Sequence, residues 1–248
     1  MTWTDLVRSE LRKLTTTRMP LGFLVVLVSL AVLNGVAVAV GTDMDGSKTF
    51  ISTEADQQSL MAFAANALMI AGLFGAIAAA REYAHNTVIA TYLAAPRRGG
   101  ALSAQLVAVA LGGALLGALG AGLTAVAVAL SLPLTEFGFL VGAGGLAQVV
   151  AAAALAGASG AVLGAAIGIV VRNTGGAVTG AVLALVIAPP LVVQLASGAE
   201  SWLPATLAGV TSGVLDEVGV ASASAALVLW ALVPAAVALQ VVRHRDVV

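Results

Sequence analysis

The chain contains no cysteine, which excludes disulfides, thiol nucleophiles and cysteine-ligated metals. Charged residues make up only 9% of its 248 residues, whereas an ordinary soluble domain carries roughly 25%. Its two histidines, His85 and His244, are far apart in sequence and lack the spacing of metal ligands. No zinc-protease motif or Ser/His/Asp arrangement is present. We therefore expect no metal, no cofactor bound by this chain and no catalytic residue.

The sequence does contain long apolar stretches, and 60% of its residues are hydrophobic. Six stretches reach the roughly 20 residues that a helix needs to cross the hydrocarbon core of a bilayer. This pattern predicts an all-α polytopic membrane protein, with residues 1–248 forming a single transmembrane domain. The expected spans are Met19–Gly41, Leu60–Ala80, Gly99–Thr135, Phe137–Val171, Thr174–Gly198 and Val218–Val242.

The third and fourth stretches are longer than one crossing requires, at 37 and 35 residues. Each could hide a second crossing, but the arginines that flank the pair, Arg97, Arg98 and Arg172, would then still have to lie on one side. Four crossings would need about 80 apolar residues plus turns. Two long helices that turn near Pro133–Gly138 fit the length better, so we expect six spans.

The basic residues follow a strict pattern along the chain. All but one of the 11 Lys and Arg residues lie in the N-terminal segment, the second connection, the fourth connection or the C-terminal tail, and Lys48 is the exception. Acidic residues lean the other way, with eight of 12 in the odd-numbered connections. Because Lys and Arg are retained on the cytoplasmic side, this predicts a multi-pass protein of the cell membrane with both termini cytoplasmic.

Before the first span, Thr2–Arg18 has the periodicity of an amphipathic helix, and Thr2 with Asp5 forms a candidate capping box. A net charge of +2 suits a helix lying on an anionic inner leaflet. The alternative is that this helix simply continues the first span, but Pro20 favours a break. The apolar face of this helix consists of Trp3, Leu6, Val7, Leu11 and Leu14. The side chains expected to face away from it are Arg8, Ser9, Arg12 and Lys13. The candidate site residues of the helix are Arg8, Glu10, Arg12 and Lys13.

The second connection, residues 81–98, is the longest polar stretch on the expected cytoplasmic side. Asn86 or Thr87 can cap a short helix, and Pro96 stops it. Tyr92 and Leu93 continue an apolar flank that begins at Val88 and Ile89. Such a helix could dock into a groove of a soluble protein. A plain polar turn, whose arginines only set topology, is an equally good interpretation of the spacing.

At these residues the chain resembles the ABC-2 type permeases, the membrane subunits of ATP-binding-cassette exporters. The similarity includes Glu82, Asn86-Thr87, Leu93 and Pro96-Arg97-Arg98. It extends to the basic N-terminal helix (Ser9–Leu14, then Thr17-Arg18), the six spans and Leu203-Pro204. Asn86 stands where the family usually has Gly, and Asn is the residue best able to share the left-handed backbone conformation with Gly.

The resemblance implies that residues 2–18 form a connecting helix and residues 87–95 a coupling helix that touches an ATPase subunit. It also implies an assembly of two permeases, or a permease and a homologue, with two ATPases that bind ATP and Mg. Glu82, Arg97 and Arg98 would anchor the coupling loop, and Tyr92 and Leu93 would fill the groove of the ATPase. The implied coupling residues are Glu82, Thr87, Tyr92, Leu93, Pro96, Arg97 and Arg98.

Two other functions stay open at this point. One is a membrane anchor or assembly factor that recruits a cytoplasmic protein, and the other is a gradient-driven carrier. The carrier is disfavoured because none of the six apolar cores contains an ionisable residue, which such carriers usually bury along the pathway. A near-match to a phosphate loop at Gly41–Thr49 has Ser47 where the Lys should be, so this chain is not expected to hydrolyse ATP. No nucleic-acid partner is expected.

Several further features of the spans have two interpretations. Glycines at small-xxx-small spacing could form a dimer seam, but packing within one subunit is the favoured interpretation. Pro189-Pro190 is expected to kink the fifth helix, and residues 197–217 to form either an interfacial or re-entrant helix or an ordinary loop. Polar residues of the spans could line a substrate path, or only bond between helices: Asn34, Asn66, Gln105, Gln148 and Gln194.

Overall fold

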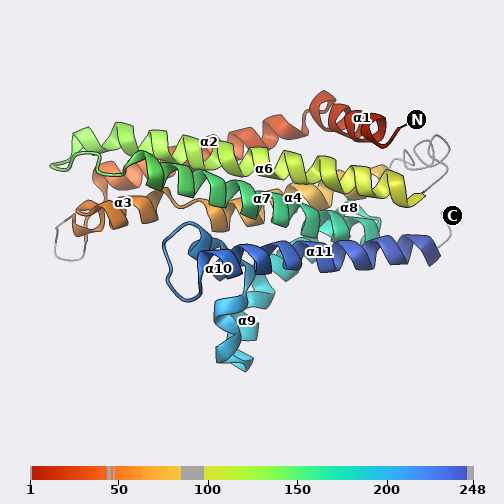
Figure 1. Ribbon diagram of the computed structural model, residues 1–248. Helices are drawn as coiled ribbons and strands as arrows, with labels where there is room; N and C mark the ends of the chain where they lie inside the picture. Colours follow the sequence, from red (N-terminus) through yellow and green to blue (C-terminus); the bar gives the residue numbers. More distant parts are fainter. Residues whose placement is uncertain (1, 44–45, 47, 85–97, 245–248) are drawn as a thin grey trace.

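The structure is a computed structural model, and it describes residues 2–43, 46, 48–84 and 98–244. Long helices run side by side, and the first helix begins at the same end of the bundle at which the last helix ends (Figure 1). Six helical segments are long and apolar enough to cross a membrane, which confirms the all-α polytopic class. They are Met19–Val40, Glu54–Ala84, Gly99–Leu134, Ala143–Val171, Thr174–Leu195 and Val220–Val242.

The elements follow one another with few long connections. In chain order they are α1 (Trp3–Thr16), α2 (Met19–Val40), η1 (Thr49–Ile51), α3 (Glu54–Met61), α4 (Ala64–Ala84), α6 (Arg98–Ser131), η2 (Leu132–Leu134), α7 (Ala143–Val171), α8 (Thr174–Val182), the π-helical η3 (Leu183–Ile187), α9 (Ala188–Leu195), η4 (Ser197–Trp202), α10 (Pro204–Thr211) and α11 (Val220–His244). This order confirms two expectations. The third and fourth spans, in α6 and α7, are each one continuous helix, and the turn between them begins at η2.

α7 lies at the centre of the bundle and contacts α4, α6, α8 and α11. Its contact with α6 is close because small residues face each other across it. A Cβ atom added to Gly113 of α6 would overlap the carbonyl oxygen of Gly157 on α7, and one added to Gly117 would overlap that of Ala153. These glycines therefore pack within the chain, as the favoured interpretation of their spacing predicts.

The other side of α7 meets α4 in the same way. A Cβ on Gly160 would overlap the carbonyl oxygen of Leu68, and one on Gly164 would overlap that of Gly72. Large side chains are excluded from this seam, so the two backbones approach more closely than Leu-rich helices can. The seams on the two sides of α7 hold α4, α6 and α7 together as one unit.

The end of the bundle away from the termini differs from the predicted boundaries. The fourth span begins at Ala143 rather than Phe137, because side chains of α3 hold the preceding chain extended. Gln57 donates to the carbonyl of Gly138 at 2.8 Å and accepts from the amide of Leu140 at 2.8 Å, while Glu54 accepts from Gly142 at 3.1 Å. These bonds replace the helical bonds that the apolar pattern alone predicted.

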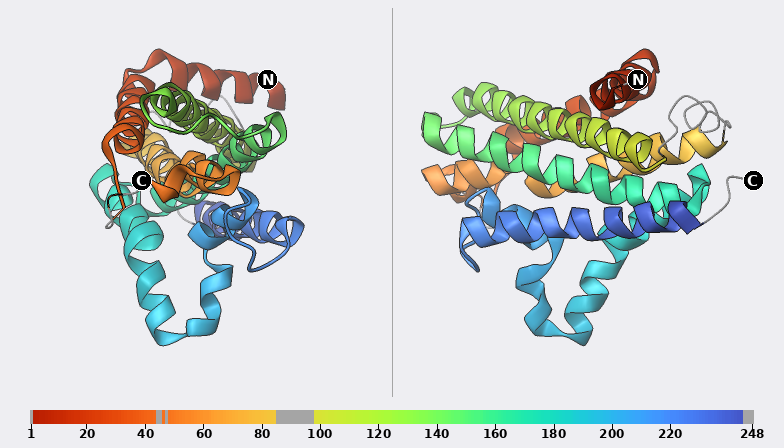
Figure 2. Two further views of the ribbon diagram at one scale, coloured as in Figure 1. Left: turned by 90° about the vertical axis from the view of Figure 1, so that its left-hand side faces the viewer. Right: turned by 45° about the vertical axis from the view of Figure 1, so that its right-hand side comes forward.

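The fifth span is irregular before its two prolines rather than at them. The π-helical turn η3 occupies Leu183–Ile187, and Pro189-Pro190 lie in the first turn of α9. Proline has no amide hydrogen to donate to the preceding turn, so the helix widens there and starts again at a position that accepts proline. Beyond this point α9 projects sideways from the bundle (Figures 1 and 2).

The segment 197–217 contains helical structure, as the interpretation of an interfacial or re-entrant helix predicts. It contains η4 and the short helix α10, which contacts α4 and α11. Leu207 and Val210 of α10 are buried, and the indole of Trp230 on α11 donates to the carbonyl of Trp202 at 2.9 Å. Its position relative to a membrane surface stays a prediction.

Candidate functional site

The candidate site lies where α1 crosses the end of the bundle. α1 starts with the predicted capping box: the hydroxyl of Thr2 accepts from the amide of Asp5 at 3.3 Å, and the Asp5 carboxylate accepts from the amide of Thr2 at 2.9 Å. These hydrogen bonds from Thr2 hold the pKa of Asp5 below its ordinary value. α1 ends at Thr16 and α2 begins at Met19, so the alternative of one continuous helix is wrong.

α1 docks on α6 through its apolar side. Leu6 is buried against Ala101 and Ala104, two small residues in the first two turns of α6. The indole nitrogen of Trp3 donates to the hydroxyl of Ser103 at 3.2 Å. α1 therefore lies across the helices rather than in line with α2, as the view along the bundle shows (Figure 2).

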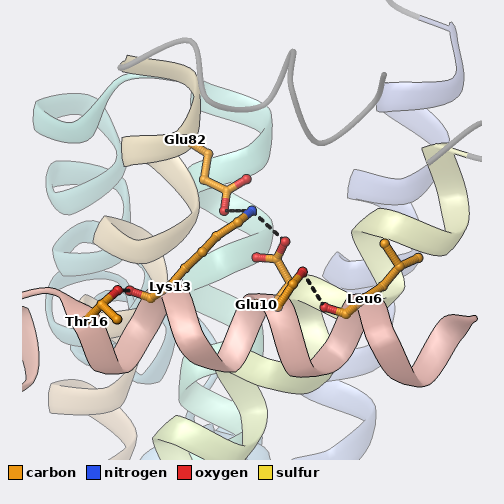
Figure 3. A network of polar contacts seen from close by, with 6 residues as sticks. Leu6, Glu10, Lys13, Thr16 and Glu82 are labelled. Carbon is orange, nitrogen blue, oxygen red and sulfur yellow. Dashed lines mark hydrogen bonds and ion pairs between the residues drawn. The ribbon is translucent and has the colours of Figure 1, made fainter. Parts of the chain in front are cut away.

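A triad of charged side chains joins α1 to α4. The ammonium of Lys13 lies 2.6 Å from a carboxylate oxygen of Glu10 and 3.1 Å from one of Glu82, near the end of α4 (Figure 3). The side chain of Glu10 is 6% exposed, that of Glu82 is 13% exposed, and that of Lys13 is 39% exposed. One partly exposed ammonium group thus forms ion pairs with two nearly buried carboxylates.

The environment of the triad changes its protonation chemistry. Burial, and then the charge of Glu82, raise the pKa of Glu10 to about 7, although the hydrogen bond with Lys13 opposes that rise. For Lys13, burial favours the neutral form, but the hydrogen bond with Glu10 and the charges of both carboxylates outweigh it and raise its pKa. Lys13 therefore stays charged near neutral pH, while Glu10 exchanges its proton there.

A cavity of about 300 Å³ adjoins the triad, between α1, α2, α4 and α6. Its wall combines the three charged residues with a further arginine, two hydroxyls and an amide, and the remaining residues are apolar. The lining residues are Glu10, Lys13, Leu14, Thr16, Thr17, Met19, Ala78, Arg81, Glu82, Gln105, Ala108 and Val109.

Two polar groups of this wall have little to bind within the described chain. Gln105 is 7% exposed, and its side-chain amide makes no hydrogen bond to any residue that the structure describes. The guanidinium of Arg81 makes one weak contact, to the sulfur of Met19 at 3.8 Å, and no ion pair with a described residue. Both groups still reach the open cavity, because the amide atoms of Gln105 are not fully enclosed and Arg81 is only half-buried.

The structure changes one prediction for α1 and leaves most coupling residues untested. Lys13 does not face away with the exposed Arg8 and Arg12, because its long side chain reaches back to Glu82. Glu82 lies on α4 beside the predicted second connection. Thr87, Tyr92, Leu93, Pro96 and Arg97, with the whole predicted coupling helix, lie outside the described residues, and for Arg98 only its place as the first residue of α6 is described.

The five candidate pathway residues do not gather at one place. Asn34 donates to the carbonyl of Leu30 on its own helix at 2.9 Å, and Gln148 donates to that of Thr211 at 3.5 Å. Asn66 and Gln194 are exposed on α4 and α9, while Gln105 alone lines the cavity. Within the part of the chain that the structure describes, no hydrogen bond joins any two of them.

The burial of Glu10 against the bundle was not predicted, although its spacing along α1 indicates it. Glu10 lies four residues after Leu6 and four before Leu14, so these three side chains share one face of the helix. A carboxylate between two apolar residues indicates a buried ion pair, and Lys13 at i+3 is its nearest partner. Its second partner, Glu82, follows only from the tertiary fold.

Comparison with known proteins does not identify a family, because no family model matches the sequence and no curated protein matches it.

Proposed function

We propose that this chain is the transmembrane subunit of an ATP-driven ABC exporter. Together with a second copy or a homologous chain it forms the substrate path, and it couples to a separate ATPase subunit that binds ATP and Mg. Closure of the ATPase pair on nucleotide pushes on residues 87–95 and on α1, and the push tilts the spans. The apolar character of the spans favours a lipophilic or amphiphilic cargo.

The observation that carries the proposal is the ion pair between Lys13 and Glu82, at 3.1 Å. Glu82 lies three residues before the 85–97 connection, so the salt bridge ties α1 to the helix that leads into that connection. Two segments that the family resemblance assigns to the ATPase contact are therefore linked side chain to side chain. A force applied to either segment reaches α4, and through the glycine seam it reaches α7.

The absence of ionisable residues from the apolar cores also supports an external energy source. Carriers driven by ion gradients usually bury a titratable group along the pathway, because that group couples cargo to the gradient. In an ATP-driven machine the coupling lies in the cytoplasmic segments instead. This agrees with a charged cluster at one end of the bundle and apolar helices elsewhere.

The test is to purify the tagged chain from its own membranes, reconstitute it into vesicles and measure ATP hydrolysis by the copurified material. We expect Mg-dependent hydrolysis that an amphiphilic cargo stimulates. The double variant Tyr92→Ala/Leu93→Ala should insert normally but lose at least tenfold of this activity, because truncation removes the apolar contacts proposed for the ATPase groove.

The matched control is Leu130→Ala/Leu134→Ala, which removes two apolar side chains that are 72% and 74% exposed at the opposite end of α6 and in η2. It should leave hydrolysis unchanged. A chain that copurifies with a soluble protein but with no ATPase activity would favour the anchor function. Transport that persists without ATP and collapses with an ionophore would favour the gradient-driven carrier.

A further inference from the structure

A strained residue lies at the corner between α7 and α8. Arg172 directly follows the last residue of α7 and has a φ of 58°, and it is the one non-glycine residue with positive φ in the described part of the chain. Helices often end in this left-handed conformation, but the residue there is usually glycine, because a Cβ atom makes the conformation costly. An arginine at this position therefore indicates that its side chain has a role that glycine cannot fill.

Membrane topology does not explain why the arginine stands at this position. Its positive charge would favour the cytoplasmic side equally well at a neighbouring exposed position, such as Asn173 or Gly175. The backbone is not left-handed at either of these positions. Position 172 differs from them in what its side chain can reach.

The guanidinium of Arg172 lies over the aromatic ring of Tyr83, in the last turn of α4. Its central carbon is 5.3 Å from the centroid of the ring, which is within the range of an attractive cation–π contact. Both side chains are half-buried, and Tyr83 also packs against the main hydrophobic core. This contact joins the end of α4 to the end of α7.

The contact lies just beyond the point where the backbones of α4 and α7 pack most closely. A Cβ atom added to Gly168 of α7 would lie 2.6 Å from the carbonyl oxygen of Ala76 and 3.1 Å from the amide nitrogen of Ala80, both on α4. No glycine follows Gly168 in α7, so glycine packing cannot extend to the turn that carries Tyr83. Arg172 continues the attachment of α4 to α7 with a side chain.

From these contacts we infer that Arg172 is a positioning residue, which fixes the last turn of α4 to the unit formed by α4, α6 and α7. Successive residues of a helix point about 100° apart, so Tyr83 meets Arg172 on one side while Glu82 meets Lys13 of α1 on another. The turn that leads into the 85–97 connection is thereby held from two directions. The consequence for coupling rests on the proposed function: a push on this connection reaches α7 through Arg172 and does not merely bend the last turn of α4.

The experiment exchanges Arg172 with Gly175 and measures the position of the end of α4. The variant Arg172→Gly/Gly175→Arg keeps the charge and composition of the fourth connection, places glycine at the left-handed position and removes the cation–π contact. Spin labels at Ala84→Cys on α4 and Leu111→Cys on α6, both exposed positions, report the distance. We expect the distance distribution to become at least twice as wide, while the unfolding temperature stays the same or rises because the strain is relieved.

Two substitutions of Tyr83 test the same contact from α4. Tyr83→Leu should widen the distribution as the exchange does, because it removes the ring but keeps an apolar side chain. Tyr83→Phe retains an aromatic face for the cation and should keep the distribution narrow. The inference would be overturned by a narrow distribution in Tyr83→Leu and the exchanged variant, by widening in Tyr83→Phe, or by a clearly lower unfolding temperature of the exchanged variant.

The consequence for coupling has a separate readout in the vesicle assay of ATP hydrolysis. Tyr83→Leu should lower cargo-stimulated hydrolysis at least fivefold, and Tyr83→Phe should retain it. A wider distance distribution without this loss would overturn the role of Arg172 in coupling. If the unaltered material hydrolyses no ATP, the proposed function is contradicted, and the distance measurements alone decide whether Arg172 positions the end of α4.

Discussion

Glu10 is the residue whose charge state matters most for the position of α1. Its pKa near 7 lies above the ordinary value of 4.5, so docked α1 binds a proton more tightly than α1 released into water. The stabilisation from this proton is complete below about pH 4.5 and is lost as the pH rises through 7. Among the described residues, the charged groups that line the cavity with Glu10 are Lys13 on α1 and Glu82 and Arg81 on α4, whereas α6 contributes the uncharged Gln105.

We therefore expect α1 to be held more firmly at pH 5.5 than at pH 8.5. Because the chain lacks cysteine, spin labels can be attached at Arg8→Cys on α1 and Leu111→Cys on α6, both exposed positions. The distance distribution should be narrow at the lower pH and broader at the higher one. Glu10→Gln should give the narrow distribution at both, and an unaltered chain without pH dependence would contradict this prediction.

Lys13 is predicted to stabilise the fold, because its removal leaves two nearly buried carboxylates without their shared cation. Lys13→Met should lower the free energy of unfolding by about 1–3 kcal/mol, which is less than for a fully buried pair since Lys13 is partly exposed. Arg12→Met is the control, since Arg12 is exposed and makes no ion pair with a described residue. Equal thermal unfolding curves for the two variants would show that the triad is not stabilising.

At the scale of elements, the close packing of α4 against α7 predicts that enlarging a glycine at their contact lowers the stability of the fold. Gly164→Ala places a Cβ against the backbone of Gly72, and a backbone cannot move aside as a side chain can. Overpacking costs about 1–3 kcal/mol, more than the roughly 1 kcal/mol that Ala gains over Gly in a helix. The variant should unfold at a lower temperature than the unaltered chain.

The matched control for that seam is Gly122→Ala on α6. A Cβ at this position would meet nothing within 4 Å, so only the gain in helix propensity remains. Its unfolding temperature should stay the same or rise slightly. If Gly164→Ala behaves as Gly122→Ala does, the helices are farther apart than the structure places them.

The sequence predicted the elements that depend on local pattern. Apolar runs located all six spans, and Thr2 with Asp5 located the start of α1, because hydropathy and capping are properties of neighbouring residues. It did not predict that residues 137–142 are extended, since the partners that hold them, Gln57 and Glu54, lie more than 80 residues earlier. α3 was missed as well, because its polar sequence lies outside the apolar run.

The candidate site was predictable only in part, for the same reason. Glu82, Glu10, Lys13 and Gln105 were all singled out from the sequence, but for separate roles on separate helices. Their meeting around one cavity depends on α1 crossing α6, which Leu6 and Ala104 determine through packing. Arg81 was recognised for topology alone, since one chain position does not show which residues surround it.

At the scale of the whole molecule, the structure places the start of α1 and the end of α11 at one end of the bundle, and the distribution of Lys and Arg predicts that this end is cytoplasmic. Single cysteines at Ala55 and Gly175, both exposed and at connections predicted on opposite sides, test this. In intact cells an impermeant maleimide should label Ala55→Cys at least tenfold faster than Gly175→Cys. Permeabilised cells should remove the difference, and equal labelling in intact cells would contradict the topology.

The glycine contacts on both sides of α7 have a consequence for how the molecule can move. Because their backbones interlock, α4, α6 and α7 resist sliding past one another and move together as one rigid unit. We therefore expect conformational change to involve the peripheral helices, which are α2, α11 and the fifth span. In the fifth span, the π-helical turn at Leu183–Ile187 is the expected hinge.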